Sequence, residues 1–341
     1  MNRFLLRARA GLSALALACT FAAPARAQST SVSVPVQNTP IIRIRLESGT
    51  LSIRTWDRQT VQITANGPVS IHHFDADAVA RAIHSDDIPV FSTSVATHQG
   101  HVLLPPEEFM APALSSAPHD GVVIAAEGAQ TVTVTIPQQS ALVWAMVAHG
   151  RIRLQDYRNG AFLLRVHTGM VALANVGGDG YAEAARGRIT VENSAFDRFR
   201  ARTAAGNIFF SNCNARQIEV SSAHGSIVYD NGTFVPGLAR FETVTGDVAL
   251  GIAGGGVQIG AHSASGQVRS NFTRGAATSG TANDVHATIN GGGPVVTASS
   301  VSGSIYLYDG AFAARPLLQQ QWTPLQQLFK ARNAARRPYR V

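Results

Sequence analysis

Histidine and aspartate side chains that could bind a metal ion gather in the segment from Pro68 to Ala129. Both residue types are zinc ligands in proteins. Their spacing here matches no ligand motif, so the sequence favours a solvated polar loop and predicts no metal site. The residues concerned are His72, His73, His84, His98, His101 and His119, together with Asp75, Asp77, Asp86 and Asp87.

A second group of acidic side chains raises the question of glycoside hydrolysis. That reaction needs two carboxyl groups a few ångströms apart on one face. The acids expected to point outward are scattered over the repeats described below, and most have an arginine nearby. We therefore predict no catalytic residue and no cofactor, with a β-helix polysaccharide lyase or glycosidase as the alternative. The acids are Glu183, Glu192, Glu219, Asp230, Glu242 and Asp247.

Glycine recurs at a nearly fixed interval through the second half of the chain. The successive spacings are 19, 18, 19, 19, 21, 20 and 37 residues, which is typical of a repeat architecture. The last spacing leaves room for a hidden coil or an insertion between Gln267 and Ser302. Each glycine is expected at a tight corner, where a positive φ or a missing side chain fits best. The corner glycines are Gly150, Gly169, Gly187, Gly206, Gly225, Gly246, Gly266 and Gly303.

Apolar residues alternate on both sides of each glycine. Ile208 and Phe210 follow Gly206 at two and four residues. The same two positions are apolar after nearly all of the remaining corner glycines. This alternation predicts two strands in each repeat, each with one buried face. The fold class is therefore all-β. We expect a parallel β-solenoid of eight or nine coils with two main sheets, roughly 40 Å long at the usual strand spacing.

An asparagine stands six residues after four successive glycines. These positions are Asn175, Asn193, Asn212 and Asn231, with aspartates at the same place in outer repeats. Stacked amides can donate and accept hydrogen bonds along the axis of a solenoid. We predict that they form an asparagine ladder; the alternative is that they are simply turn residues.

Charged residues alternate in sign at outward positions of neighbouring repeats. Arg200, Glu219 and Arg240 occupy one such column, and Arg202 and Glu242 lie in the next. Opposite charges on adjacent strands attract each other. The pattern indicates a solvated face that neutralises itself and is unsuited to binding an anionic ligand.

The first 27 residues have the features of a secretory signal peptide. Three arginines precede the apolar run from Gly11 to Ala23, and Ala25-Arg26-Ala27 is a small-x-small cleavage site. Cys19 suggests a lipoprotein as the alternative, but Ala16 stands where a lipobox favours leucine. The protein is thus expected to be exported to the periplasm, the cell surface or the medium.

The basic character of the chain is confined to its ends. The formal charge is +7, yet four arginines lie in the signal and six basic residues lie in 311–341, which leaves residues 28–310 at −3. A body of this charge does not predict nucleic-acid binding. Cys213 is the one cysteine outside the signal, so no internal disulfide can form, and we expect this thiol to be buried.

The remaining chain divides into a single solenoid domain, 28–310, and a basic tail, 311–341. Residues 41–65 look like entry strands, and 68–129 is predicted to be an insertion with a short helix from Asp75 to His84. In the tail, Thr323-Pro324 is a favourable helix start. We expect that helix to cap the open end of the solenoid; a disordered tail, or contact with a membrane surface or a partner, are the alternatives.

Several repeats resemble the bacterial "putative adhesin" family built on a DUF4097-type β-solenoid. The resemblance rests on the Ser/Thr-Gly-x-Val units at 243–250 and 263–270, on the related unit Thr-Ala-Ala-Gly-Asn-Ile-Phe-Phe at 203–210, and on Val-Thr-Ile-Pro leading into Gly150. It implies surface interaction and assigns no catalytic residues. The function predicted on this basis is an exported, non-catalytic binding or structural protein. Its solenoid flank would contact a glycan or an envelope protein.

Overall fold

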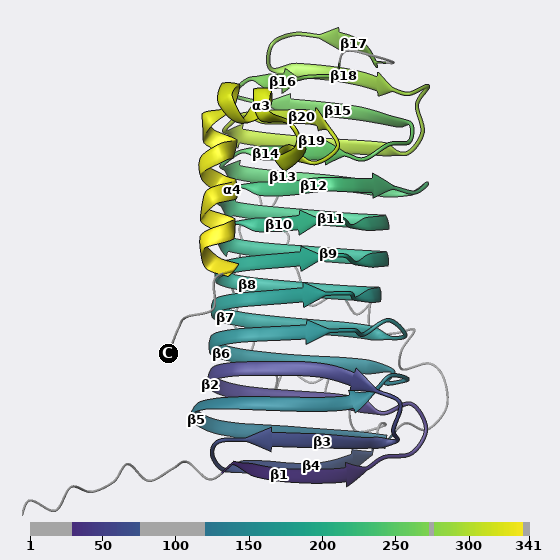
Figure 1. Ribbon diagram of the computed structural model, residues 1–341, viewed down its shortest axis with the longest axis vertical. Coiled ribbons are helices and arrows are strands. Elements are labelled where there is room, and N and C mark those ends of the chain that lie inside the picture. The colour runs from purple at the N-terminus through teal and green to yellow at the C-terminus, as the bar shows by residue number, and fades with distance from the viewer. Residues whose placement is uncertain (1–28, 76–119, 273–275, 337–341) are drawn as a thin grey trace, which may run out of the picture.

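The protein is a stack of β-strands with a helix along one side (Figure 1). The computed structural model describes residues 29–75, 120–272 and 276–336. Its strands are β1 (Thr30–Pro35), β2 (Ile41–Trp56), β3 (Thr60–Ala65), β4 (Val69–Asp75), β5 (Asp120–Pro137), β6 (Leu142–Gln155), β7 (Ala161–Ala174), β8 (Gly177–Glu192), β9 (Ala195–Ala205), β10 (Ile208–Ser211), β11 (Asn214–His224), β12 (Ile227–Phe234), β13 (Leu238–Thr245), β14 (Val248–Ile252), β15 (Val257–Ser263), β16 (Val268–Ser270), β17 (Ala276–Gly280), β18 (Asp284–Ile289), β19 (Val295–Ser302) and β20 (Ile305–Asp309).

Parallel pairing between equivalent positions of successive repeats confirms the predicted all-β, solenoid-like architecture. Ile189 lies beside Ile208, which lies beside Ile227. Because side chains alternate along a strand, one apolar set from each repeat points inward. These side chains form one continuous core, in which Ile208, Ile227 and Val248 are completely buried.

At the N-terminal end, the strands do not stack in the order of the sequence. Strand β2 pairs in parallel with both β5 and β6, so it lies between two strands that follow each other in the chain. Strands β3 and β4 then run antiparallel to β5, and β1 runs antiparallel to β3. Antiparallel strands thus cover this end of the parallel stack, as edge protection requires.

The C-terminal end is built in the same manner. The last repeat, β19 and β20, inserts between β13–β14 and β15–β16. Strand β18 runs antiparallel to β15, and β17 runs antiparallel to β18. The long final glycine spacing therefore contains an antiparallel hairpin, and the last repeat returns into the stack. Because of this interleaving at both ends, the number of coils, eight or nine, stays a prediction.

Part of the insertion expected at 68–129 is β-strand in the structure. Strand β4 and the first part of β5 fall within that range and pair with each other in register from Val69–Ala126 to Asp75–Asp120. Asp75 is thus a strand residue. The rest of the predicted helix up to His84 lies outside the described residues, as do His98, His101 and His119.

The C-terminal helix exists, but the expectation that it caps the open end is wrong. The tail forms η1 (Phe312–Ala314), α3 (Pro316–Gln321) and α4 (Thr323–Arg336), and α4 begins at the predicted Thr323-Pro324. It runs lengthwise down one flank of the stack (Figure 1). The cause is an outward apolar strip on that flank, described below. Among the described residues, no helix is both long and apolar enough to cross a membrane.

Candidate binding surfaces

The four ladder asparagines lie in one column, one per repeat. Asn212 Nδ2 donates to Asn193 Oδ1 at 3.1 Å, and Asn231 Nδ2 donates to Asn212 Oδ1 at 2.7 Å. At the lower end, Asn175 Nδ2 donates to Asp156 Oδ1 at 3.0 Å. The side-chain hydrogen bonds thus form two groups along this column, Asp156 with Asn175 and Asn193 with Asn212 and Asn231.

Backbone conformation gives these positions a second reason to be asparagine. Asn175, Asn193, Asn212 and Asn231 have φ between 49° and 56°, and Asp156 has φ of 58°. Asparagine and aspartate tolerate this left-handed conformation better than other residues with a Cβ. The same residues therefore form side-chain hydrogen bonds along the column and adopt the left-handed conformation of a turn.

Replacing Asn212 with alanine is expected to destabilise the protein by about 1–3 kcal/mol. The change removes both ladder hydrogen bonds of Asn212 and places a Cβ residue without a polar side chain at φ of 54°. Chemical denaturation measures the loss. Asn212→Gly separates the two causes, because glycine accepts this φ but also lacks the amide. If both variants unfold like the parent, the rungs contribute nothing.

The corner glycines are required by the close approach of successive backbones. A Cβ on Gly206 would lie 1.6 Å from the carbonyl oxygen of Gly187, and one on Gly187 would lie 1.7 Å from that of Gly169. Most of these glycines also have positive φ, for example 148° at Gly206. Gly266 is the exception: its φ is not positive, but a Cβ there would lie 2.0 Å from the oxygen of Gly303.

The sequence reading missed the first members of this glycine column. Gly49 has φ of 115° and lies beside Gly150, and Gln130 takes the corner position in β5. The signal was present, since Leu51 and Ile53 follow Gly49 at the same two positions as in later repeats. Gly49 stands outside the regular series because β3, β4 and β5 come between β2 and β6 in the chain.

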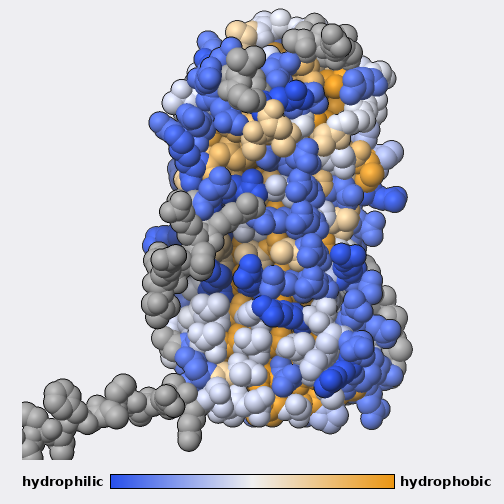
Figure 2. Space-filling model, in the orientation of Figure 1, coloured by the Kyte–Doolittle hydropathy of each residue, from blue (hydrophilic) through white to orange (hydrophobic). Residues whose placement is uncertain are grey.

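The outer face of the sheet containing β9, β11 and β13 carries paired charges in its middle part. Arg200 Nε lies 2.9 Å from Glu219 Oε2, and Arg165 Nε lies 3.1 Å from Glu183 Oε2. The strand register places Glu219 between Arg200 and Arg240, as the alternating column predicts. In the space-filling view, hydrophilic side chains cover most of the visible surface, with hydrophobic colour between them (Figure 2).

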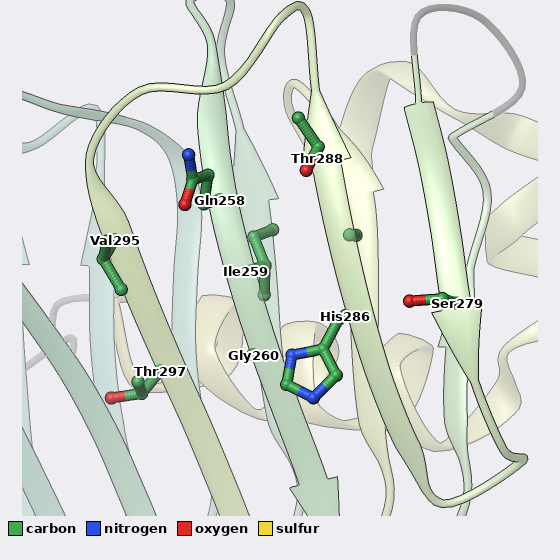
Figure 3. A pocket seen from close by; sticks show the side chains of 9 residues that line it. Gln258, Ile259, Gly260, Ser279, His286, Thr288, Val295 and Thr297 are labelled. Atoms are coloured by element: carbon green, nitrogen blue, oxygen red, sulfur yellow. The ribbon is translucent and has the colours of Figure 1, made fainter.

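A shallow depression of about 420 Å³ lies near the C-terminal end of this same face (Figure 3), and we call it the polar depression after its hydrogen-bonding side chains, although Ile259, Ala287 and Val295 also line it. Strands β19, β15, β18 and β17 lie side by side there. Gly260, which has no side chain, pairs with Thr297 on one neighbouring strand and with His286 on the other. The lining supplies amide, imidazole and hydroxyl groups, and none of its residues is acidic. These residues are Gln258, Ile259, Gly260, Ser279, His286, Ala287, Thr288, Val295 and Thr297.

Two histidines and one aspartate lie at the edge of the depression. His262 Nδ1 is 3.7 Å and His286 Nε2 is 3.8 Å from the carboxylate oxygens of Asp284. Within the described ranges, no three histidine, cysteine, aspartate or glutamate side chains converge as metal ligands. Of the histidines considered from the sequence, His72 and His73 are exposed on β4.

The candidate acids are dispersed over different surfaces. Glu183, Glu219 and Glu242 each lie near an arginine on the charged face. Asp247 Oδ1 accepts a hydrogen bond from the Ser304 backbone at 2.8 Å, and both residues directly follow a corner glycine. Glu192 and Asp230 both lie beneath α4, where they contact Arg332.

Helix α4 is held by an apolar strip on the outer side of strands β10, β12, β14 and β20. Phe209, Val228, Ala249 and Tyr306 occupy equivalent positions of successive repeats and are almost completely buried under the tail. The Tyr306 and Trp322 rings lie 5.1 Å apart between centroids, and the Phe312 and Phe329 rings stack at 4.7 Å. Burial of this much aromatic surface explains why the tail follows the flank.

A buried polar cluster fixes the C-terminal half of α4. Arg332 has 5% exposure and lies 3.7 Å from Glu192 and 3.9 Å from Asp230. Asp230 also accepts hydrogen bonds from Tyr308 Oη and from the Phe312 backbone. Burial raises the pKa of Asp230, opposed by these two hydrogen bonds and by the charge of Arg332.

Replacing Arg332 with methionine is expected to cost about 3–5 kcal/mol, since the change leaves Asp230 buried without its cation. Equilibrium denaturation of the full chain measures this loss. The matched variant carries both Arg332→Met and Asp230→Asn, which removes the uncompensated charge, and it should recover part of the stability. A single variant as stable as the parent would show that Arg332 does not hold the helix.

Cys213 is buried, as expected from the sequence. Burial raises the pKa of its thiol to about 11. The thiol therefore stays protonated at neutral pH and is a poor nucleophile.

The sequence profile of the Toastrack DUF4097 family matches residues 17–307, so the chain belongs to that family. This confirms the resemblance seen in the repeats. A solved structure described as a "putative cell adhesion protein" from Clostridium sporogenes is similar at 8% sequence identity. That similarity covers 83% of this chain and 99% of the other chain, with a TM-score of 0.21. No curated protein matches the chain.

Proposed function

We propose that this protein is an exported, non-catalytic binding protein that contacts a glycan or another envelope component through one flank of its solenoid. The observation that carries the proposal is the polar depression around Gly260. Its polar side chains are one amide, three hydroxyls and one imidazole, which are groups that hydrogen-bond sugar hydroxyls, and Val295 and Ile259 add apolar surface that a sugar ring can contact. The surrounding face is neutralised by its own ion pairs, which favours an uncharged or weakly charged ligand over a strongly anionic one.

The composition of the depression also favours binding over hydrolysis. A glycosidase needs two carboxyl groups beside the scissile bond, and no lining residue is acidic. Asp284, at the edge, lies between two histidines. A β-helix carbohydrate-active enzyme is the alternative, and reducing-end release from the bound glycan is the assay that would favour it.

A glycan-array screen with the mature chain tests the proposal. Gln258→Ala and Thr288→Ala should each weaken binding by about five-fold or more, because each removes a neutral hydrogen bond. Glu219→Ala, on the charged part of the same face, is the control and should bind like the parent. Binding that survives both pocket variants and fails with the control would refute the assignment of this site.

Export is part of the proposal. The signal-like residues 1–27 support it, and protease accessibility on whole cells distinguishes a periplasmic location from a surface location.

A further inference from the structure

Arginine side chains gather on the outer side of β2, β6, β7 and β8, in the part of each strand that follows its corner glycine. Because Ile152 between them is in the core, Arg151 and Arg153 point outward, and both are exposed. Arg54 of β2 and Arg188 of β8 point outward for the same reason. We call the surface that these four arginines form the arginine face. It lies below the end of α4 in Figure 1.

The arginine face has little negative charge to neutralise it. Between its corner glycine and its last residue, each of these strands lacks acids except β8, where Glu192 lies 3.7 Å from Arg332 of α4. The turns after β2 and β6 contain Asp57 and Asp156. Within the described residues, none of the four arginines forms an ion pair with any of these carboxylates. The surface therefore carries an uncompensated positive charge.

Arg188 shows that part of this charge is poorly hydrated. The residue is half-buried, and its guanidinium carbon lies 5.5 Å from the centre of the Phe209 ring. Burial lowers the pKa of Arg188, because desolvation disfavours the charged form. An anion on the arginine face would replace some of the lost hydration. This arginine thus gains more from an anionic partner than a fully solvated arginine does.

The spacing of the arginines suits a ligand with repeated negative charges. Arg151 and Arg153 are two residues apart on one strand, which is about 7 Å. The register places Met170 between Arg151 and Arg188, so these two lie two strand spacings apart, about 10 Å. Arg54 adds a further cation on β2, which pairs with β6. A small anion can contact one or two of these arginines, whereas an anionic polymer can contact them all.

We propose that the arginine face binds an acidic polysaccharide, in which carboxylates recur along a chain of sugars. The planar guanidinium group binds a carboxylate through two parallel hydrogen bonds. Thr50, Ser52 and Thr190 point outward among the arginines, and their hydroxyls can hydrogen-bond sugar hydroxyls. A membrane surface would require a row of large apolar side chains. The described outward positions of this face present Met170 but no such row.

This site is separate from the polar depression in place and in ligand. The depression lies near the C-terminal end of the stack and has no acidic or arginine side chain in its lining. The arginine face lies in the N-terminal half, on β2 and β6 to β8. The protein would therefore hold a neutral ligand at one site and an acidic polymer at the other.

Binding of the full mature chain to polygalacturonate tests the proposal. The double variant Arg151→Gln, Arg153→Gln should weaken this binding by about ten-fold or more, since each arginine makes charge-assisted hydrogen bonds. The matched control is Arg216→Gln, Arg240→Gln, which lowers the net charge equally. Its two arginines lie 3.9 Å and 3.6 Å from carboxylates of their own, so it should bind like the parent. The basic tail is the same in all three chains and cannot cause the difference.

Three outcomes would overturn the proposal. Equal weakening in the two double variants would show that only net charge attracts the polymer. Binding to polygalacturonate no tighter than to neutral dextran would show that the carboxylates are not recognised. Vesicles of phosphatidylcholine with phosphatidylglycerol test a membrane as the partner. Tighter binding to these vesicles than to polygalacturonate, lost in the Arg151→Gln, Arg153→Gln variant, would assign the arginine face to lipid.

Exchanging the ligands between variants separates this proposal from the proposed function. The Arg151→Gln, Arg153→Gln variant should bind neutral glycans of the array like the parent, and Gln258→Ala should bind polygalacturonate like the parent. Circular dichroism verifies that the variants are folded. If folded Gln258→Ala loses polygalacturonate binding as strongly as the arginine variant, the arginine face is not a separate site.

Discussion

Ile208→Asp is expected to unfold the protein, with a loss of about 4 kcal/mol or more in the free energy of unfolding. Ile208 is completely buried and lies between Ile189 and Ile227 in the core. A carboxylate at this position would be desolvated with no cation among its apolar neighbours. Loss of the β-sheet signal in circular dichroism, or a large fall in melting temperature, measures the effect.

Gln217→Asp is the matched control for this prediction. Gln217 is exposed on β11, and its neighbour in the register is Arg198. The same acidic side chain is therefore placed in water beside a positive charge and should change stability by less than about 0.5 kcal/mol. If Ile208→Asp melts like this control, the inward assignment of the column is incorrect.

Gly206→Ala is expected to cost about 3 kcal/mol or more. The added Cβ would lie 1.6 Å from the Gly187 carbonyl oxygen, so the two repeats would have to separate. The φ of 148° adds backbone strain for any residue with a Cβ. Because the obstructing atom is backbone oxygen, no side-chain movement relieves the clash. Thermal or chemical denaturation measures the loss.

Gly254→Ala separates the cost of an unfavourable φ from the cost of a steric clash with the neighbouring backbone. Gly254 has a φ of 65°, but a Cβ there meets no atom within 4 Å. This variant should lose only about 1 kcal/mol, the cost of the left-handed conformation. Equal losses for the two variants would mean that close stacking is not the reason for glycine at the corners.

The register between repeats was predictable because each repeat contains the same short pattern of glycine, apolar residue and asparagine. Gly206, Ile208 and Asn212 have different physical requirements, namely close backbone approach, burial and a left-handed φ, yet they recur with the same spacing. When independent requirements repeat together, the stacking of equivalent residues follows without knowledge of the fold. The paired charges of Arg200 and Glu219 followed from the same register.

The order of strands at the two ends could not be predicted in this way. Strand β2 and strand β19 have the same alternating pattern as their neighbours, so the pattern fits any level of the stack. Which level each strand occupies depends on pairing between residues far apart in the chain, as between Thr245 and Ser302. Local periodicity carries no information on that choice.

The position of the tail helix had a signal that could have been used. Outward residues of a solvated sheet are polar, but Phe209, Val228, Ala249 and Tyr306 are apolar at equivalent outward positions. Such a strip predicts a cover on the flank and argues against a helix across the end. The polar depression had no comparable signal, because Gly260 and His286 become neighbours only through the antiparallel pairing of β18 with β15.

The stacking of equivalent residues is tested most directly by the distance between spin labels at His149 and Thr245. Both residues are exposed and occupy the position before a corner glycine. The register runs from His149 through Thr168, Arg186, Ala205 and His224 to Thr245. Five strand spacings predict a narrow distance distribution near about 24 Å. A broad distribution, or a much longer distance, would contradict the stacked register.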